Sequence, residues 1–269
     1  MKQDQRPNLV RTFGLLHGVC NICGQEAKLT EDHTPPKGWA RPKQVELRHV
    51  VDKLGMEDGN RKRATRSQNG LKYRTLCGRC NNGLLGARYD PALITFANEV
   101  ASTLQTTAVL SSLQWFSIQP QAVMRAVLGH MCAQGVGRYA KGPLTEAVRQ
   151  YMLDESLPLP DGLSFYYWAY PFRHQVIIRD AVFTDFSDQG PVMFWLLKAY
   201  PLAFMLTWTP SPRLPFSLQT LDPLRSASFG DMASVPLYLS PLVPELWPEA
   251  PPDDYAVLYG PEAVTASSL

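Results

Sequence analysis

The residues of this sequence with the clearest chemistry are four cysteines in two Cys-x-x-Cys pairs. The first pair is Cys20 and Cys23, the second is Cys77 and Cys80, and 53 residues separate them. Four thiolates from two short loops are the ligand set of a structural zinc ion. Such a site has no open coordination position, so the expected zinc stabilises the fold and takes no part in catalysis. Four buried free cysteines, or a redox-active pair, are the alternatives.

An acidic residue and a histidine lie between the two cysteine pairs. Asp32 comes nine residues after Cys23 and is followed by His33, and Asn81 follows the last cysteine directly. Histidine titrates near neutral pH and can take a proton from water, whereas carboxylate and amide oxygens are ligands that Mg²⁺ prefers. Neighbouring side chains of a strand point to opposite faces, so Asp32 and His33 serve one site only if the strand bends.

Each of these residues also has an ordinary structural role open to it. Asp32 and His33 can be a plain pair at a strand end, with the His33 ring satisfied by a backbone carbonyl group. Asn81 suits the N-cap of a helix, and so does Asp90, because a proline follows it. The other histidines, His130 among them, match no motif and are expected in core or surface roles.

In their order and spacing, these elements resemble the HNH or ββα-metal endonuclease family. Its zinc-bearing members read Cys-x-x-Cys, Asp-His-x-x-Pro, then Cys-x-x-Cys followed by Asn or His. The resemblance covers about residues 17–90, with Pro36 in the proline position. It implies a treble-clef module, a general base at His33, and one Mg²⁺ or Mn²⁺ ion held by Asp32 and Asn81. It also implies hydrolysis of phosphodiester bonds in nucleic acid, with DNA favoured over RNA.

Two positions depart from the pattern of that family. The family usually has Asn five residues before the third cysteine, where Lys72 stands here, and a basic residue three positions after Asn81, where Leu84 stands. Asn69 takes over the role of the missing Asn only if the loop shifts. The departures keep a second hypothesis open, in which the zinc-stabilised scaffold is catalytically inactive and binds nucleic acid or a protein.

Positive charge is concentrated in the first third of the chain. Residues 1–90 carry 17 Lys and Arg against 9 Asp and Glu, a net charge of +8, whereas residues 91–269 carry 9 against 15, a net charge of −6. The basic part is therefore expected to contact the phosphates of a nucleic acid. A solvated loop is the alternative for 61–66, which contains no aromatic residue for base stacking. The residues expected to bind nucleic acid are Arg61, Lys62, Arg63, Arg66, Lys72 and Arg74.

The expected fold class is α+β, in two parts. Residues 1–90 form the zinc module, and residues 91–269 form an α+β domain of unknown role that is available to a protein partner or to a homodimer. Helices are predicted over about 91–156, and aromatic and β-branched runs predict strands over about 163–210, followed by a Pro-rich tail. Within the helical segment, the spacing predicts helix starts near Asp90 and Pro120 and a third helix over 144–153.

Composition sets the class of protein. Of the 269 residues, 45% are hydrophobic and 19% are charged, which is typical of a globular chain rather than a disordered one. The first ten residues contain no apolar segment, and the most apolar stretch, 191–208, is interrupted by Lys198 and Pro201. We therefore expect no secretory signal, no membrane span and a cytoplasmic location.

Overall fold

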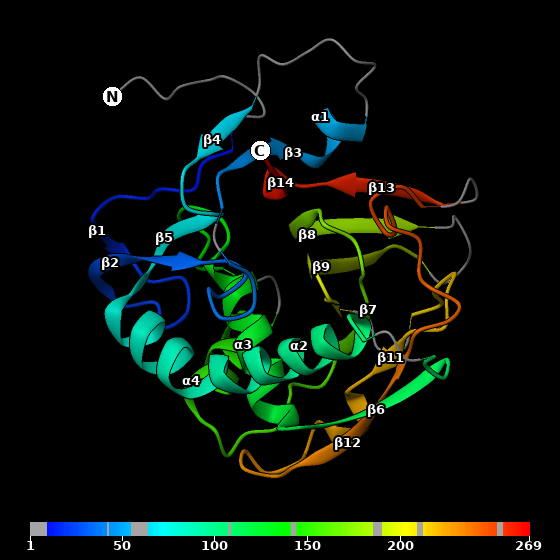
Figure 1. Cartoon of the computed structure of the whole chain (residues 1–269). Helices are drawn as coiled ribbons and strands as arrows, with labels where there is room; N and C mark the ends of the chain where they lie inside the picture. The colour runs from blue at the N-terminus through cyan, green and yellow to red at the C-terminus, as the bar shows by residue number, and fades with distance from the viewer. Residues whose placement is uncertain are drawn as a thin grey trace.

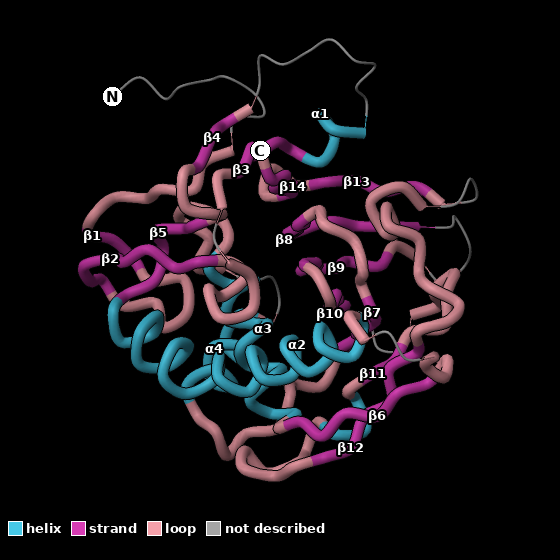
Figure 2. Tube along the Cα trace, viewed as in Figure 1, coloured by secondary structure: helices cyan, strands magenta, loops and turns pink. Residues whose placement is uncertain are grey.

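A computed structural model gives the fold of the chain. It describes residues 10–41, 43–54, 64–106, 109–140, 144–184, 190–208, 212–251 and 255–269. Within these residues the strands form three sheets, and helices pack against all three, so the expected α+β class is confirmed (Figures 1 and 2).

The first layer is a three-stranded antiparallel sheet close to the N-terminus. It consists of β1 (His17–Val19), β2 (Glu26–His33) and β5 (Lys72–Cys77), in the order β1-β2-β5. A β-bulge interrupts the pairing of β2 with β5 between Thr30 and Glu31. The π-helical segment η2 (Arg79–Tyr89) is separated from β5 by Gly78 and packs against β2 and β5. Two strands followed by a helix is therefore the local arrangement around the cysteine motifs.

The second layer is a nine-stranded sheet. Its order is β11-β7-β10-β9-β8-β14-β3-β4, and β13 pairs with β8 alongside β14. The bounds are β3 (Val45–His49), β4 (Thr65–Ser67), β7 (Ser164–Ala169), β8 (Gln175–Thr184), β9 (Val192–Ala199), β10 (Leu202–Thr207), β11 (Gln219–Thr220), β13 (Ala256–Tyr259) and β14 (Ala263–Ser268).

The middle of this sheet is covered on both faces. Every residue of β7 and β10 is buried, because each strand is a run of aromatic and aliphatic residues instead of an alternating pattern. Phe165 and Tyr167 belong to the larger core that includes the helices, whereas Tyr166 and Trp168 belong to a second core on the other face. The aromatic runs of the second half thus form the strands that the sequence predicts over 163–210.

Four α-helices are described: α1 (Val50–Leu54), α2 (Asp90–Leu104), α3 (Pro120–Ala133) and α4 (Thr145–Leu153). The predicted helix starts near 90 and 120 and the third helix are confirmed. All residues of α3 are buried, because this helix packs against β2 and β5 on one side and against β8 and β9 on the other. None of the helices in the described ranges is long and apolar enough to cross a membrane.

Strands also occur where the sequence predicts none. The strand β6 (Leu113–Ile118) lies inside the segment predicted as helical, and it pairs with β12 (Ala233–Tyr238) from the Pro-rich tail. The tail also supplies β13 and β14 to the large sheet. These strands are short, and their partners lie far away in sequence, so local patterns do not reveal them.

Residues before position 90 enter the sheet of the second part. The strand β14 lies between β8 and β3, with Val264 opposite both Ile177 and His49, and β4 pairs with β3 at the edge. The strands β3 and β4 thus belong to the large sheet, while the cysteine motifs belong to the small one. The C-terminus ends beside β3, as Figure 1 shows.

Candidate metal centre and active site

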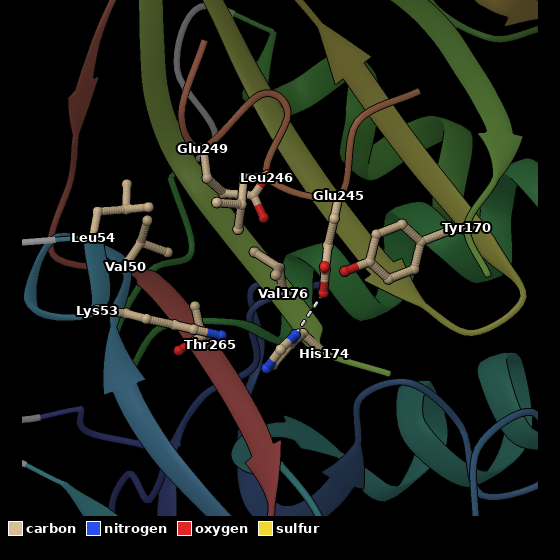
Figure 3. Close-up of a pocket in the computed structure, with 10 residues that line it drawn as sticks. All are labelled: Val50, Lys53, Leu54, Tyr170, His174, Val176, Glu245, Leu246, Glu249 and Thr265. Atoms are coloured by element: carbon tan, nitrogen blue, oxygen red, sulfur yellow. Dashed lines mark hydrogen bonds and ion pairs between the residues drawn. The ribbon is translucent and has the colours of Figure 1, made fainter. Parts of the chain in front are cut away.

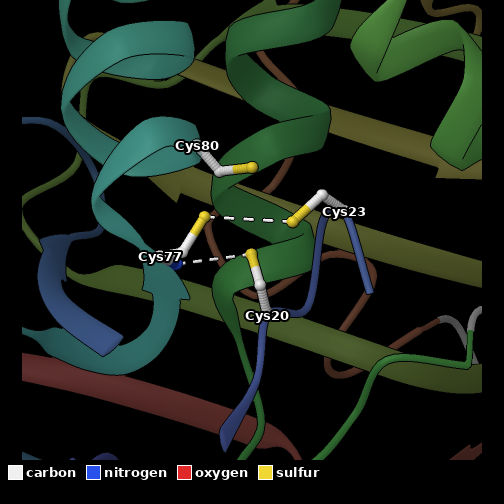
Figure 4. Close-up of side chains that lie close together, drawn as sticks. All are labelled: Cys20, Cys23, Cys77 and Cys80. Atoms are coloured by element: carbon white, nitrogen blue, oxygen red, sulfur yellow. Dashed lines mark hydrogen bonds between the residues drawn. The ribbon is translucent and has the colours of Figure 1, made fainter. Parts of the chain in front are cut away.

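The four paired cysteines meet where β5 ends and η2 begins (Figure 4). All four are buried, and their sulfur atoms all lie within 4.8 Å of one another. The Sγ atoms of Cys23 and Cys77 are 3.9 Å apart. Sulfur atoms bound tetrahedrally at about 2.3 Å from one zinc ion lie about 3.8 Å from one another. The four cysteines are therefore positioned to hold a metal ion and are compatible with a structural zinc.

The first cysteine turn is fixed by its neighbours. Gly24 has a φ of +73°, and a Cβ atom there would lie 2.7 Å from the ring of Tyr139, so the turn requires glycine. The buried amide of Asn21 donates to the backbone carbonyls of Cys132 and Gly135 at 3.0 and 2.8 Å. These contacts attach the turn to the C-terminal end of α3, which places the cysteine pair before any ion binds.

His33 ends β2 with a buried ring nitrogen, Nε2, that has no partner among the described residues. The Asn69 backbone lies close enough to the ring to raise its pKa. Burial, assisted by the charges of Lys37 and Lys72, nevertheless lowers the pKa of His33 below its usual value. The ring is therefore neutral at neutral pH, and Nε2 can accept a proton.

The His33 side chain lines a small pocket between the small sheet and the large one. Arg41 and Lys43 line the same pocket, together with Gln175 at the start of β8 and Ser268 at the end of β14. Two cations and two neutral polar side chains beside an unpaired ring nitrogen suit the oxygen atoms of a phosphate group. Sequence reasoning missed these four residues, because only the long-range pairing of β14 brings two of them to this place.

Asp32 points to the opposite, buried face of β2. Its side chain is 4% exposed, and Oδ2 accepts hydrogen bonds from His130 Nδ1 at 2.9 Å and Thr34 Oγ1 at 3.2 Å. His130 Nε2 is 2.9 Å from Asp90 Oδ1. Burial by itself lowers the pKa of His130, but the two carboxylates outweigh it and raise this pKa well above the usual value. A protonated His130 thus joins two acidic side chains.

This buried Asp32–His130–Asp90 chain corrects the helix cap expected at Asp90. Tyr89 occupies the N-cap position of α2, because η2 runs directly into that helix, and the Asp90 carboxylate accepts from His130 instead. His130 is a buried residue, as expected for a core position, but its contacts went unpredicted because 98 residues separate it from Asp32. A histidine on the apolar stripe of a predicted helix was the available signal.

Asn81 holds the bend in β2. Its Nδ2 donates to Thr30 Oγ1 at 2.9 Å and to the Glu31 carbonyl at 3.0 Å, at the position of the β-bulge. The bulge precedes Asp32 and His33, which pair in regular register with Tyr73 and Lys72 and point to opposite faces, so it does not bring these two side chains to one site. Gly78, and not Asn81, occupies the N-cap position of η2. The amide nitrogen of Asn81 is hydrogen-bonded. Its amide oxygen is a ligand of the type that a hard cation prefers.

The basic residues expected to contact nucleic acid fall into three groups. Lys72 and Arg74 form ion pairs with Glu31 at 2.8 and 2.9 Å. Arg66 is exposed on β4 at the edge of the large sheet. The remaining residues, Arg61, Lys62 and Arg63, lie outside the described part of the chain.

A second group of ionisable side chains surrounds another pocket of the large sheet (Figure 3). His174 Nδ1 lies 2.6 Å from Glu245 Oε1, and Lys53 lines the same pocket. Behind it, Lys198 on β9 donates to both carboxylate oxygens of Glu249 at 2.7 and 2.8 Å. None of the residues selected from the sequence lies here, and Glu245 and Glu249 each have a side-chain partner, His174 and Lys198.

The four-cysteine centre is the one group of three or more His, Cys, Asp and Glu side chains that converges to hold a metal within the described ranges. The Asp32 carboxylate is not part of this cysteine centre, and it lies on the face of β2 opposite to His33. Comparisons of the chain with protein-family models, with curated proteins and with solved structures each find no match.

Proposed function

We propose that this protein hydrolyses phosphodiester bonds of nucleic acid as an HNH-type endonuclease, with DNA favoured over RNA. The observation that carries the proposal is the buried Nε2 atom of His33, which has no partner within the described ranges. A buried ring nitrogen without a partner costs stability, and such exceptions in folded proteins concentrate at functional sites. Arg41 and Lys43 beside it supply positive charge for a phosphate.

His33 acts as general base in this proposal. Nε2 takes a proton from water as the water oxygen attacks the phosphorus atom, and the bond from phosphorus to the 3′ oxygen breaks. Burial keeps the pKa of His33 low, so the ring is neutral before it takes this proton. Arg41 and Lys43 balance the charge of the phosphate oxygens. The Mg²⁺ or Mn²⁺ ion that the resemblance implies would be held by Asp32 and Asn81, but the Asp32 carboxylate is buried on the opposite face of β2 and bound to His130, so no part of this step is assigned to that ion.

We also propose that zinc is the ion of the four-cysteine centre and that the module is a treble clef. The ligand set, its burial and its sulfur spacing support zinc. Two of the sulfurs come from the turn before β2, and the other two come from the end of β5 and the start of η2. The ion would therefore tie the strand that carries His33 to the helix that carries Asn81.

A catalytically inactive, zinc-stabilised module that binds nucleic acid or a protein is the second candidate. It is favoured by the surroundings of Asp32, whose carboxylate is 4% exposed and already accepts from His130 and Thr34. A carboxylate committed to a buried imidazolium is less available to a divalent ion. The basic side chains on the exposed face remain available for phosphates in this candidate.

A plasmid-nicking assay with added Mg²⁺ or Mn²⁺ separates the two candidates. We expect the wild type to cleave and His33→Ala to lose a factor of about 10²–10⁴ in rate, with zinc content and nucleic-acid binding retained. His174→Ala is the matched control, because that histidine lies in the other pocket and is ion-paired to Glu245. Equal cleavage by the wild type and His33→Ala would reveal a contaminating nuclease. No cleavage of DNA or RNA by the wild type favours the binding module.

A further inference from the structure

The face of the small sheet that carries His33 extends beyond the pocket. Side-chain alternation puts Glu31 and His33 on one face of β2 and Lys72 and Arg74 on the same face of β5. The residues between them are buried on the other face. Across the strands, His33 lies opposite Lys72 and Glu31 lies opposite Arg74. Lys72 and Arg74 therefore lie on the same face of the sheet as His33, on the neighbouring strand.

Phe13 continues this face beyond the edge of β5. It forms a parallel bridge with Arg74, whose backbone accepts from the Gly14 amide at 3.2 Å and donates to the Thr12 carbonyl at 2.9 Å. The ring is 45% exposed. Its centroid lies 5.1 Å from Arg74 Cζ and 5.7 Å from Lys72 Nζ. Both cations therefore lie at cation–π distance from a ring that remains partly open to solvent.

This arrangement has surplus positive charge and an open aromatic surface. One carboxylate, that of Glu31, pairs with both Lys72 and Arg74, so one positive charge is left over. On the other side of His33, Arg41 and Lys43 add two more cations. Phe13 lies two strand spacings from β2, about 10 Å from the strand that carries His33. A ligand with both anionic groups and flat apolar faces along its length matches this surface.

We propose that Phe13 stacks on an unpaired base of a single-stranded nucleic acid, while Lys72 and Arg74 contact its phosphates and direct the strand toward His33. Bases of a duplex stack on one another and hide their faces, whereas an unpaired strand offers them to an aromatic side chain. The strand-binding surface stands on its own contacts, and only the direction toward His33 rests on the proposed function. The aromatic residue that 61–66 does not contain is supplied by the lead-in to β1.

Fluorescence anisotropy with a labelled oligo-dT, and with a duplex as comparison, tests this surface. All variants are made on a His33→Ala background without added Mg²⁺, so that cleavage cannot affect the binding signal. We expect Phe13→Ala to weaken oligo-dT binding about tenfold, because stacking on one aromatic ring is lost. Phe13→Trp retains the affinity. Leu15→Ala is the matched control, since Leu15 is 73% exposed near the same strand and has no aromatic ring.

The inference fails if the His33→Ala protein does not bind oligo-dT, if Phe13→Ala binds it with unchanged affinity, or if Phe13→Ala weakens duplex binding equally. It also fails if Leu15→Ala weakens binding as much as Phe13→Ala, because the patch would then be a general apolar contact suited to a protein. Phe13→Leu keeps an apolar side chain, and its melting temperature reveals any fold defect. Failure of the nuclease is distinguishable, since a strand-binding protein without cleavage keeps the Phe13 effect.

Discussion

The two pockets lined by ionisable side chains satisfy them in different ways. In the pocket of the large sheet, His174 has the Glu245 carboxylate as partner (Figure 3), and behind this pocket Lys198 has the Glu249 carboxylate. At the end of β2, Nε2 of His33 has no partner among the described residues, and Arg41 and Lys43 line the same pocket. A pocket with paired side chains stabilises the fold, whereas a base and two cations without partners in the part of the chain that the structure describes are suited to a ligand.

The largest expected effect concerns the four-cysteine centre that supports the His33 region. Cys20→Ser should abolish zinc binding and destabilise the protein by an amount comparable to the metal's contribution, about 10 kcal/mol. Cys132→Ala is the control, because Cys132 is equally buried but lies in α3, apart from the cluster. Metal analysis and thermal melts of both variants provide the measurement. A wild type without zinc, with all cysteines alkylated in the folded state, contradicts the assignment.

The paired region makes a prediction of its own. Lys198→Met leaves the Glu249 carboxylate buried without a partner and should cost about 3–5 kcal/mol of unfolding free energy. The double variant Lys198→Met/Glu249→Leu should recover most of that loss, because apolar residues replace the whole ion pair. Urea unfolding of both proteins tests this, and cleavage should persist in the double variant. A double variant as unstable as the single one would show that the pair is more than a structural contact.

The buried chain of Asp32, His130 and Asp90 combines features of both pockets. Its side chains are paired with one another, and one of them, Asp32, is a proposed site residue. Asp90→Asn removes one charge from the pair with His130 and should cost about 1–3 kcal/mol. Asp154→Asn is the control, because that carboxyl caps a turn at the surface near Ser156. The free energy of unfolding in urea is the quantity to compare. An equal loss in both variants would argue against a special role for the buried chain.

The smallest expected effect is electrostatic. Lys72→Gln should leave the fold intact and reduce the salt dependence of nucleic-acid binding by about one phosphate contact, a change of about 0.7 in slope on a single strand. Arg149→Gln is the matched control, because Arg149 is ion-paired to Glu146 on α4. Affinity measured across a salt series gives the slope. Identical slopes for wild type and Lys72→Gln would place Lys72 outside the binding face.

Much of the metal centre is predictable because its information is local. Two Cys-x-x-Cys turns identify themselves by spacing, and the helix after Asp90 is indicated by the proline that follows it. The presence of Lys72 where the family usually has Asn also affects His33. The Asn69 backbone contacts the His33 ring, while the charge of Lys72 helps to lower the pKa of His33.

The remainder depends on pairings between distant segments. No local pattern joins β14 to both β3 and β8, yet this pairing carries Ser268 to the His33 pocket. His130 meets Asp32 because α3 packs between the two sheets. Phe13 joins the His33 face through a single bridge to Arg74. Such contacts are set by packing of the whole chain, which residue spacing alone does not encode.

Chemical rescue at His33 tests the central claim most directly. We would measure single-turnover cleavage of a labelled nucleic acid by His33→Gly, with Mg²⁺ or Mn²⁺, in the presence and absence of added imidazole. The account predicts a large loss of cleavage rate in His33→Gly and partial recovery with imidazole. Imidazole should not restore cleavage by Asn81→Ala, because Asn81 is not the proton acceptor. If His33→Gly cleaves as fast as the wild type without imidazole, His33 is not the general base and the assignment is contradicted.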